Sequence, residues 1–416
     1  MRLGGRTQAA IDVLDDIEKR KRPASEALRD WGLAHRFAGG GDRSAIGSLV
    51  YDSLRRRSSQ AWRMGDDSPA SIVYATLIGQ WNLTIDELGA AFEGDRFSPA
   101  MPPAERLAAW QERDLDKAPD HVRADIAQWC QPHFERAFGG DWVREGAALA
   151  RRPPLDMRAN TLKASRDKVL ARLQQWDARP GPLSPQVVRI EPGIRDARLP
   201  NVQAEPEYQK GWFEIQDAGS QAAARLAGAR PGQQVLDFCA GAGGKTLALA
   251  AAMENRGQIH AHDSDRNRLA PIFERLKRAG VRNAQVHARV GDLEHLAGRM
   301  DLVLVDAPCT GSGTWRRRPD AKWRLDERNL AQRQGEHVRP GGQLVYVTCS
   351  LLPPENADRI EAFLARNRDF LAGRLDMARL CDPAHHSAAD LSRVTLTPLQ
   401  GGCDGFFVAS FVRMAD

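Results

Sequence analysis

A glycine-rich turn in the second half of the chain combines residue types that bind small ligands. The apolar run 235–239 leads into residues 240–244, which are Ala-Gly-Ala-Gly-Gly, and Lys245 and Thr246 follow where a helix is expected to begin. Glycines let a ligand approach the backbone closely, and the free amides of a helix N-terminus point toward that ligand. The turn is therefore the first candidate binding site.

Three ligands compete for this turn. A phosphate-binding Walker loop requires a glycine where this chain has Cys239. A dinucleotide fingerprint that starts at Gly241 requires its third glycine where Thr246 stands. S-adenosyl-L-methionine remains, because it carries no phosphates and needs close backbone approach for its amino-acid end and an acidic residue for its ribose hydroxyls.

Two acidic residues lie where such a ligand would need them. Asp263 ends the next apolar run, 18 residues beyond Lys245, where an acid on the second strand faces a ribose. Asp292 follows the third run and is placed to meet the adenine amino group. Each of them is also a reasonable helix cap. The glycine-rich turn that precedes both residues favours a cofactor role over a helix cap, and we predict that role for both.

Two cysteines follow the fourth and fifth apolar runs. Cys309 closes the sequence Asp306-Ala307-Pro308-Cys309, and Cys349 follows the run 343–348. Carboxyl ends of neighbouring strands in an open α/β sheet lie on one side, beside the ligand crevice. The two thiols are therefore expected to converge over the cofactor. The six cysteines contain no C-x-x-C pair, so no metal is expected.

A pair of thiols beside a methyl donor suits one reaction in particular. C5 of cytosine is a poor nucleophile, but addition of a thiolate at C6 makes an enamine that attacks a methyl group. A second group must then remove the C5 proton so that elimination frees the enzyme. Two cysteines at this rim match that requirement, although coincidental packing of two small apolar residues gives the same sequence pattern.

The elements that must position these residues change in type along the chain. Residues 1–140 have helical periodicity and no reactive cluster, and residues 141–213 read as a small α+β module. From residue 214 to 416, short apolar runs at 235–239, 258–262, 286–288, 301–305 and 343–348 alternate with helices. This alternation predicts an α/β fold with a doubly wound, mostly parallel, Rossmann-like sheet.

Composition narrows the class of protein without naming a function. Of the 416 residues, 42% are hydrophobic and 27% charged, and the net charge is +5, which permits nucleic-acid binding without requiring it. The first residues carry arginines but no apolar segment, and no run approaches a membrane span. We expect a cytoplasmic monomer with no membrane partner.

The motifs together resemble the Sun/Fmu/Nop family of RNA 5-methylcytosine methyltransferases. The resemblance is carried by residues 238–246, by Asp306 to Cys309, by Lys322-Trp323, by residues 348–356 and by Asp404-Gly405-Phe406-Phe407 near the C-terminus. It covers the chain from about residue 150 onward. The N-terminal region is more loosely similar to the NusB-type helical domain of the bacterial RsmB branch.

The resemblance implies a role for each matching residue. It implies Cys349 as the nucleophile, Cys309 in product release, and catalytic or cofactor roles for Asp306 and Lys245. Whether Lys245 helps to form a thiolate or holds the methionine carboxylate stays open, as does the chemical choice between the two cysteines. Ala242 stands where the family usually has proline. The cofactor contacts implied are Cys239, Ala240, Gly241, Ala242, Gly243, Gly244, Lys245, Asp263, Asp292 and Asp306.

Structured RNA is the expected substrate, with small-subunit ribosomal RNA favoured and transfer RNA as the alternative. Trp315 and the arginines at 316–318 are candidates for base stacking and phosphate binding. Arg158, Lys163 and Arg166 of the α+β module are candidates for contacts with a phosphate backbone. A non-catalytic RNA-binding or assembly factor is a further reading, which the presence of both cysteines, the glycine turn and Asp263 disfavours.

Overall fold

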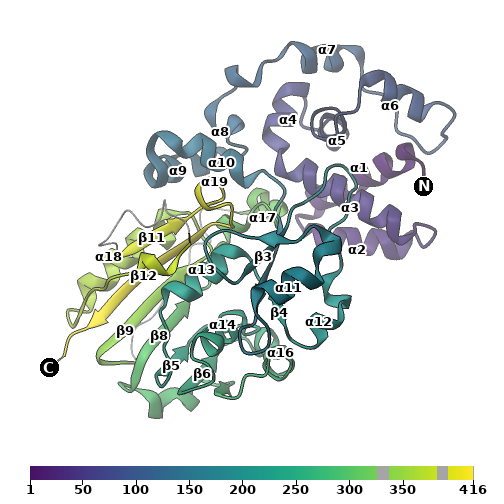
Figure 1. Ribbon diagram of the computed structural model, residues 1–416. Helices are drawn as coiled ribbons and strands as arrows, with labels where there is room; N and C mark the ends of the chain where they lie inside the picture. The colour runs from purple at the N-terminus through teal and green to yellow at the C-terminus, as the bar shows by residue number, and fades with distance from the viewer. Residues whose placement is uncertain (326–336, 382–391, 416) are drawn as a thin grey trace. The chain divides into compact units, whose positions relative to one another are not determined.

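The computed structural model describes residues 1–325, 337–381 and 392–415 (Figure 1). Spatial contacts divide the chain into two compact units. The first contains Met1–Pro153 with the segments Pro192–Leu199 and Thr314–Glu327, and the second contains Pro154–Glu191, Pro200–Gly313 and Arg328–Asp416. The predicted division into three parts, at residues 140 and 213, stays a prediction of the sequence.

The first unit is helical in its described part. Its core is formed by apolar residues at helical spacing, such as Val13, Leu14 and Ile17, which are all buried. Its helices are α1 (Leu3–Arg20), α2 (Ala24–Ala34), α3 (Gly40–Arg55), α4 (Arg57–Met64), α5 (Pro69–Gly79), α6 (Ile85–Phe92), α7 (Ala104–Glu112), α8 (Asp120–Arg123), α9 (Gln131–Phe138), α10 (Trp142–Leu149) and α17 (Pro319–Arg324). Short 3-10 helices are η1 (Leu115–Lys117), η2 (Gln128–Cys130) and η3 (Gly139–Asp141).

The segment around α17 is part of the helical unit although it follows the Pro-Cys motif in sequence. Trp315 is fully buried, and its ring stacks on Phe134 with centroids 6.0 Å apart. Lys322 is also buried and donates from Nζ to the carbonyl oxygen of Arg55 at 3.0 Å. The expectation that Trp315 stacks on an RNA base is therefore wrong, because the hydrophobic core of the helical unit already covers its ring.

The second unit contains a small antiparallel sheet with the order β2-β3-β1-β4. The strands are β1 (Leu155–Ala159), β2 (Arg179–Pro180), β3 (Val187–Ile190) and β4 (Phe213–Ile215), with α11 (Arg166–Arg172), α12 (Pro206–Gln209), η4 (Gln174–Trp176) and η5 (Val202–Ala204) beside them in sequence. Arg158 of β1 is only 6% exposed. The expectation that Arg158 contacts a phosphate backbone is therefore wrong.

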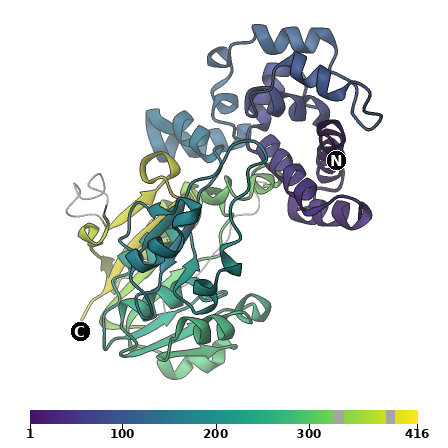
Figure 2. The ribbon, with the colours of Figure 1, turned by 45° about the vertical axis from the view of Figure 1, so that its right-hand side comes forward.

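The large sheet of this unit has the order β10-β12-β9-β8-β5-β6-β7, with β11 paired to β12. Strands β5 to β9 run parallel, and β12 is antiparallel to β9, as the yellow C-terminal strand shows in both ribbon views (Figure 1, Figure 2). The strands are β5 (Gln234–Asp237), β6 (Gln258–His262), β7 (Ala284–His287), β8 (Met300–Asp306), β9 (Val338–Thr348), β10 (Phe370–Ala372), β11 (Arg393–Leu396) and β12 (Phe406–Arg413).

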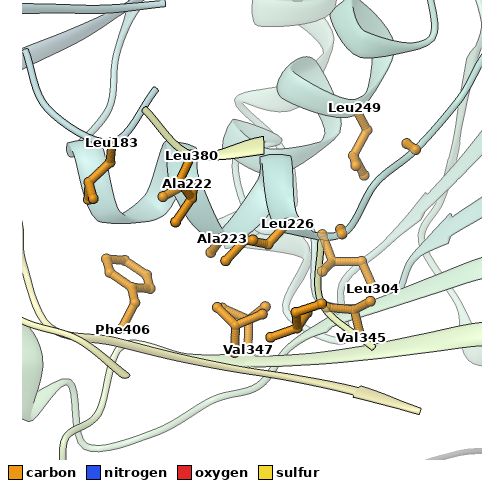
Figure 3. Close-up of a cluster of buried hydrophobic side chains, with 14 of the residues drawn as sticks. Leu183, Ala222, Ala223, Leu226, Leu249, Leu304, Val345, Val347, Leu380 and Phe406 are labelled. Carbon is orange, nitrogen blue, oxygen red and sulfur yellow. The ribbon is translucent and has the colours of Figure 1, made fainter. Parts of the chain in front are cut away.

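Alternate residues of these strands fill two hydrophobic cores, one on each face of the sheet. Leu304, Val345 and Val347 pack with one face, whereas Val303 and Val305 pack with the other. Figure 3 shows the first core, where Ala222, Ala223 and Leu226 of α13 point toward the strands. The helices of this unit are α13 (Ala218–Leu226), α14 (Gly244–Ala252), α15 (Arg266–Leu269), α16 (Ile272–Ala279), α18 (Ala357–Arg366) and α19 (Pro398–Gly401), with η6 (Val290–Leu296), η7 (Ser312–Thr314), η9 (Pro353–Glu355) and η10 (Met377–Arg379).

The order of the parallel strands fixes where a ligand crevice forms. From β5 the chain continues to β6 and β7 on one side, and it then returns to β8 on the other side of β5. Such a reversal leaves a crevice at the carboxyl ends of the strands. The predicted doubly wound, Rossmann-like sheet is confirmed. Within the described residues, no helix is both long enough and apolar enough to cross a bilayer.

Candidate active site

The glycine-rich turn lies between β5 and α14, at the carboxyl edge of the sheet. Gly241 and Gly243 adopt φ values of +50° and +82°, in the left-handed region that glycine tolerates. A Cβ atom on Gly243 would lie 2.5 Å from Cγ1 of Ile272, so the helix α16 packs directly against the turn. The N–H of Ala240 donates to the carbonyl oxygen of His262 at 2.8 Å and joins the turn to β6.

Asp263 is hydrogen-bonded to this turn, whereas the hydrogen bond of Asp292 is to a different segment. The carboxylate of Asp263 is 2% exposed and accepts from the N–H of Gly241 at 2.9 Å and from the N–H of Asp265, also at 2.9 Å. Asp292 is exposed and accepts from the N–H of Arg289 at 3.2 Å, which caps η6. Both residues stay predicted cofactor contacts, and only Asp263 is hydrogen-bonded to the turn itself.

Lys245 and Asp306 meet where α14 begins and β8 ends. Lys245 Nζ donates to Asp306 Oδ2 at 2.6 Å and lies 5.3 Å from the ring centroid of Phe406. The side chain of Lys245 is 7% exposed, whereas that of Asp306 is 32% exposed. The ion pair therefore joins a buried ammonium group to a carboxylate that still faces solvent.

Asp237 is a polar residue of this site that the sequence analysis did not single out. It ends β5, is fully buried, and accepts from Thr246 Oγ1 at 2.7 Å through Oδ2. Within the described residues its Oδ1 has no hydrogen-bond donor. Burial raises the pKa of Asp237 to about 7, and burial also raises the pKa of the nearby Cys239 thiol to about 12. The position of an acid at the end of the first strand was the available signal.

The two candidate thiols lie in direct contact. The Sγ atoms of Cys309 and Cys349 are 3.4 Å apart. The hydrogen bond from Cys309 lowers the pKa of Cys349 and, by the same contact, raises the pKa of Cys309. The charge of Lys245 also lowers the pKa of Cys349, while Asp306 raises it. Cys349 is thus the thiol whose thiolate form is favoured, with Cys309 as its donor.

A buried glutamate holds the loop that carries Cys309. Glu355, at the end of η9, accepts from the N–H of Thr310 at 2.8 Å and from Thr310 Oγ1 at 2.6 Å. The carbonyl oxygen of Glu355 in turn accepts from the hydroxyl of Tyr346 at 2.8 Å. Glu355 is 3% exposed, so these bonds are shielded from water.

Hydroxyl and amide side chains fix the loop that carries Cys349. Thr348 Oγ1 donates to Asn356 Oδ1 at 2.6 Å, and Asn356 Nδ2 donates to the carbonyl oxygen of Ser350 at 2.9 Å. The hydroxyls of Ser312 and Ser350 lie 3.1 Å apart and connect this loop to the other one. The residues on both sides of Cys349 are therefore immobilised by bonds to residues 312 and 356.

The structure thus brings several predicted residues into contact, and it gives Asp292 a hydrogen bond outside this group. Cys309 contacts Cys349, Lys245 contacts Asp306, and Asp263 contacts the glycine turn. Only for Asp292 is the hydrogen bond described a helix cap. In the part of the chain that the structure describes, no cluster of three or more His, Cys, Asp or Glu side chains could hold a metal ion.

Comparisons with known proteins assign this arrangement to a family. The family described as 16S rRNA methyltransferase RsmB/F matches residues 224–412, and the ferredoxin-like domain described as Methyltr_RsmF/B-like matches residues 126–195. The chain is 35% identical over 301 residues to ribosomal RNA small subunit methyltransferase B of Klebsiella pneumoniae, a match that covers 69% of this chain and 65% of that relative. The chain therefore spans slightly less than two thirds of that relative's length.

Solved structures share the fold. The crystal structure of PH0851 superposes with a TM-score of 0.69 at 21% identity and covers 99% of this chain and 100% of that one. A methyltransferase homolog protein from Pyrococcus horikoshii superposes with a TM-score of 0.54 at 28% identity and covers 71% of this chain and 98% of that one. The family matches and the 35% identical relative confirm the predicted resemblance, and the chain belongs to the RsmB/F methyltransferase family.

Proposed function

We propose that this chain is an S-adenosyl-L-methionine-dependent RNA (cytosine-C5)-methyltransferase that acts on small-subunit ribosomal RNA. One observation carries the proposal: the Sγ atoms of Cys309 and Cys349 lie 3.4 Å apart at the ends of β8 and β9. This edge of the sheet also holds the glycine turn, where a methyl donor binds in Rossmann-like methyltransferases. The family to which the chain belongs supports the same reaction.

The residues at the turn fit S-adenosyl-L-methionine. Asp263 is buried at the end of β6, where a carboxylate accepts bonds from ribose hydroxyls, and Asp237 keeps one carboxyl oxygen without a donor in the described structure. We assign the contacts to residues 239–245, Asp263, Asp292 and Asp306. When bound, this cofactor supplies an electrophilic methyl group next to the thiols.

Cys349 begins the reaction in this proposal. Its Sγ thiolate forms a bond to C6 of cytosine, and the electron pair of the C5–C6 double bond becomes available for C5 to attack the methyl group. Cys309 favours the thiolate because its S–H donates to the Cys349 sulfur. The target base must leave its stack for the sulfur to approach C6 from the face of the ring.

Cys309 assists the release of the product. After C5 has gained the methyl group, the C5 proton passes to a base, the C5–C6 double bond forms again, and the bond between C6 and Cys349 Sγ breaks. Cytosine thus gains a methyl group and loses one proton to the base, the methyl donor is left as S-adenosylhomocysteine by cleavage of its bond between sulfur and the methyl carbon, and Cys349 returns to its thiolate form. The position of Cys309 beside Cys349 makes it our candidate for this second half of the reaction.

The helical unit and the small sheet are proposed to bind RNA, with the protein acting as a cytoplasmic monomer. Lys163 and Arg166 remain candidates for phosphate contacts because, unlike Arg158, they are not fully buried. The predicted N-terminal domain, residues 1–140, supplies affinity for RNA and carries no chemistry in this proposal. The site of methylation is set by RNA structure around the exposed base.

Methyl transfer to defined RNAs tests the proposed function. The protein should transfer radiolabelled methyl groups from S-adenosyl-L-methionine to small-subunit ribosomal RNA from a strain that lacks the gene, and bisulfite sequencing should locate one modified cytosine. The demethylated product should bind in calorimetry, and Asp263→Ala should weaken this binding at least about tenfold. Incorporation of the methyl label into transfer RNA alone would show that small-subunit ribosomal RNA is not the substrate. Tight magnesium-dependent binding of ATP without binding of the product would overturn the cofactor assignment.

A further inference from the structure

Two arginines donate hydrogen bonds to carbonyl oxygens of the glycine-rich turn. Arg275 of α16 donates from Nη1 to the carbonyl oxygen of Ala242 at 2.7 Å. Arg158 of β1 donates from Nη1 to the carbonyl oxygen of Gly244 at 2.9 Å. The turn is therefore held at two of its carbonyl oxygens by side chains from distant parts of the chain, Arg275 about 30 residues after the turn and Arg158 about 90 residues before it.

One buried carboxylate organises part of this arrangement. Glu214 of β4 is 2% exposed and accepts from Arg275 Nη2 at 3.1 Å and from Arg278 Nη2 at 2.6 Å. Glu214 also lies opposite Arg158 in the register of β1 and β4. Arg158 donates to the side-chain oxygen of Gln216, and within the described residues no carboxylate lies at ion-pair distance from it.

These contacts orient the peptide groups of the turn. In a trans peptide the carbonyl and the following N–H point in opposite directions. The carbonyl of Gly244 points toward Arg158, so the N–H of Lys245 points away from it, among the first free amides of α14. A cation beside a helix N-terminus is unfavourable unless an anion is near. Glu214 offsets part of the charge of Arg158, so the first amides of α14 stay directed toward a ligand that carries a carboxylate.

We propose that Arg158 and Arg275 are positioning residues that hold the glycine turn in the shape that binds the amino-acid end of the cofactor. This inference rests on the proposed function, because it assumes that S-adenosyl-L-methionine binds at the turn. It gives the small sheet a second role beside RNA binding, since β1 and β4 supply Arg158 and Glu214.

The residue at position 242 offers an independent check on this inference. Alanine does not itself fix φ at position 242, and the described backbone hydrogen bonds include none that its N–H donates. Proline at this position fixes φ without loss of a hydrogen bond. Ala242→Pro should therefore replace part of the constraint that Arg275 supplies.

The experiment measures binding of two probes to the full chain by calorimetry. S-adenosylhomocysteine carries the amino-acid end, whereas 5′-methylthioadenosine lacks it. Arg158→Met and Arg275→Met should each weaken binding of S-adenosylhomocysteine about tenfold, because each loses one charged hydrogen bond to the turn. Binding of 5′-methylthioadenosine should change less than about twofold. Ala242→Pro in the Arg275→Met background should restore at least half of the lost affinity on a logarithmic scale.

Arg278→Met is the matched control. Arg278 lies on the same helix and binds the same Glu214, but it donates to no carbonyl of the turn. It should lower the melting temperature as Arg275→Met does while leaving the affinity for S-adenosylhomocysteine unchanged. Equal affinity of Arg275→Met, Arg278→Met and the wild type would overturn the inference, as would equal weakening of both probes. Failure of the wild type to bind S-adenosylhomocysteine would instead overturn the proposed function.

Discussion

Each of the two units contains a buried lysine, and the two lysines have different kinds of partner. Lys322 of the helical unit donates from Nζ to the carbonyl oxygens of Arg55 and Asp125, and burial lowers its pKa to about 8. Lys245 of the second unit pairs with the carboxylate of Asp306, which is 32% exposed. The first lysine is enclosed by backbone acceptors, whereas the second presents its partner to the crevice.

Two buried carboxyl groups show the same contrast. Asp125 of the helical unit accepts from the N–H and the hydroxyl of Ser59, at 2.9 and 2.7 Å, and so uses both of its oxygens. Asp237 in the second unit uses one oxygen and has no described donor at the other. Buried polar groups whose bonds are complete stabilise a fold, whereas a buried carboxyl group with a raised pKa at a strand end is a candidate for a functional role.

The largest effect on stability is expected in the helical unit. Lys322→Met removes two hydrogen bonds to carbonyl oxygens and the stronger of the two positive charges that act on the buried Asp125, so the free energy of unfolding should fall by about 3 kcal/mol. Urea unfolding measures this change. Binding of S-adenosylhomocysteine by the folded fraction should stay unchanged. A stable variant with lost product binding would show that Lys322 belongs to the site and would break the comparison.

Lys245→Met should lower activity strongly and stability only slightly, the opposite of Lys322→Met. The variant loses the ion pair to Asp306 and a positive charge that lowers the pKa of Cys349, so kcat/KM for methyl transfer should fall roughly 100-fold. The melting temperature should move by only a few degrees because Asp306 remains in contact with solvent. Steady-state kinetics and a thermal melt on the same preparation separate the two effects. Activity close to the wild type would remove Lys245 from the site.

Glu355→Gln should disturb the thiol loop without changing the cofactor turn. The variant loses the negative charge that strengthens both bonds to Thr310, and its amide nitrogen can bind the Thr310 hydroxyl only as a donor, so the loop carrying Cys309 is held more weakly. We expect kcat to fall about tenfold while the affinity for S-adenosylhomocysteine changes less than about twofold. Glu361→Gln on the exposed face of α18 is the matched control, since its side chain is 71% exposed. Equal losses in both variants would refute a specific role for Glu355.

Asp237→Asn should produce the smallest change in stability, and it tests the role of the carboxyl oxygen that has no described hydrogen-bond donor. Burial raises the pKa of Asp237 to about 7, above its value in the unfolded chain, so its contribution to stability is lost as the pH rises through about 7. Relative to the wild type, the asparagine variant should gain about 1.4 kcal/mol between pH 6 and pH 8, because only the carboxyl group loses its proton in the folded protein over this range. Urea unfolding at both pH values measures the difference. A parallel pH dependence in the two proteins would contradict the raised pKa.

Much of the fold and the position of the site follow from local sequence patterns. The predicted strand at 258–262 coincides with β6, and the predicted strand at 301–305 lies within β8. The glycines at 241 and 243 adopt the positive φ values that a tight turn requires. These features were predictable because each depends on residues that are adjacent in sequence, where periodicity and glycine content are direct signals.

Contacts between distant residues could not be predicted in the same way. Trp315 looks like an exposed aromatic beside three arginines, yet its ring is buried against Phe134, about 180 residues earlier in the chain. Glu355 follows two prolines in a motif whose sequence gives no partner, and its carboxylate binds Thr310. Arg275 is one of several arginines on an amphipathic helix, and only the packing of α16 directs it to Ala242. Such partners depend on tertiary packing.

The two thiols in contact have different tasks in the proposed reaction, and a trapped protein–RNA complex tests this difference most directly. Wild type, Cys309→Ala and Cys349→Ala are incubated with S-adenosyl-L-methionine and unmodified RNA and then separated on a denaturing gel. In the proposed reaction Cys349 makes the bond to C6 and Cys309 assists its cleavage, so a covalent complex should accumulate for Cys309→Ala and be absent for Cys349→Ala. The reverse pattern would exchange the two roles. Full activity of both variants with no complex in either would contradict the covalent mechanism.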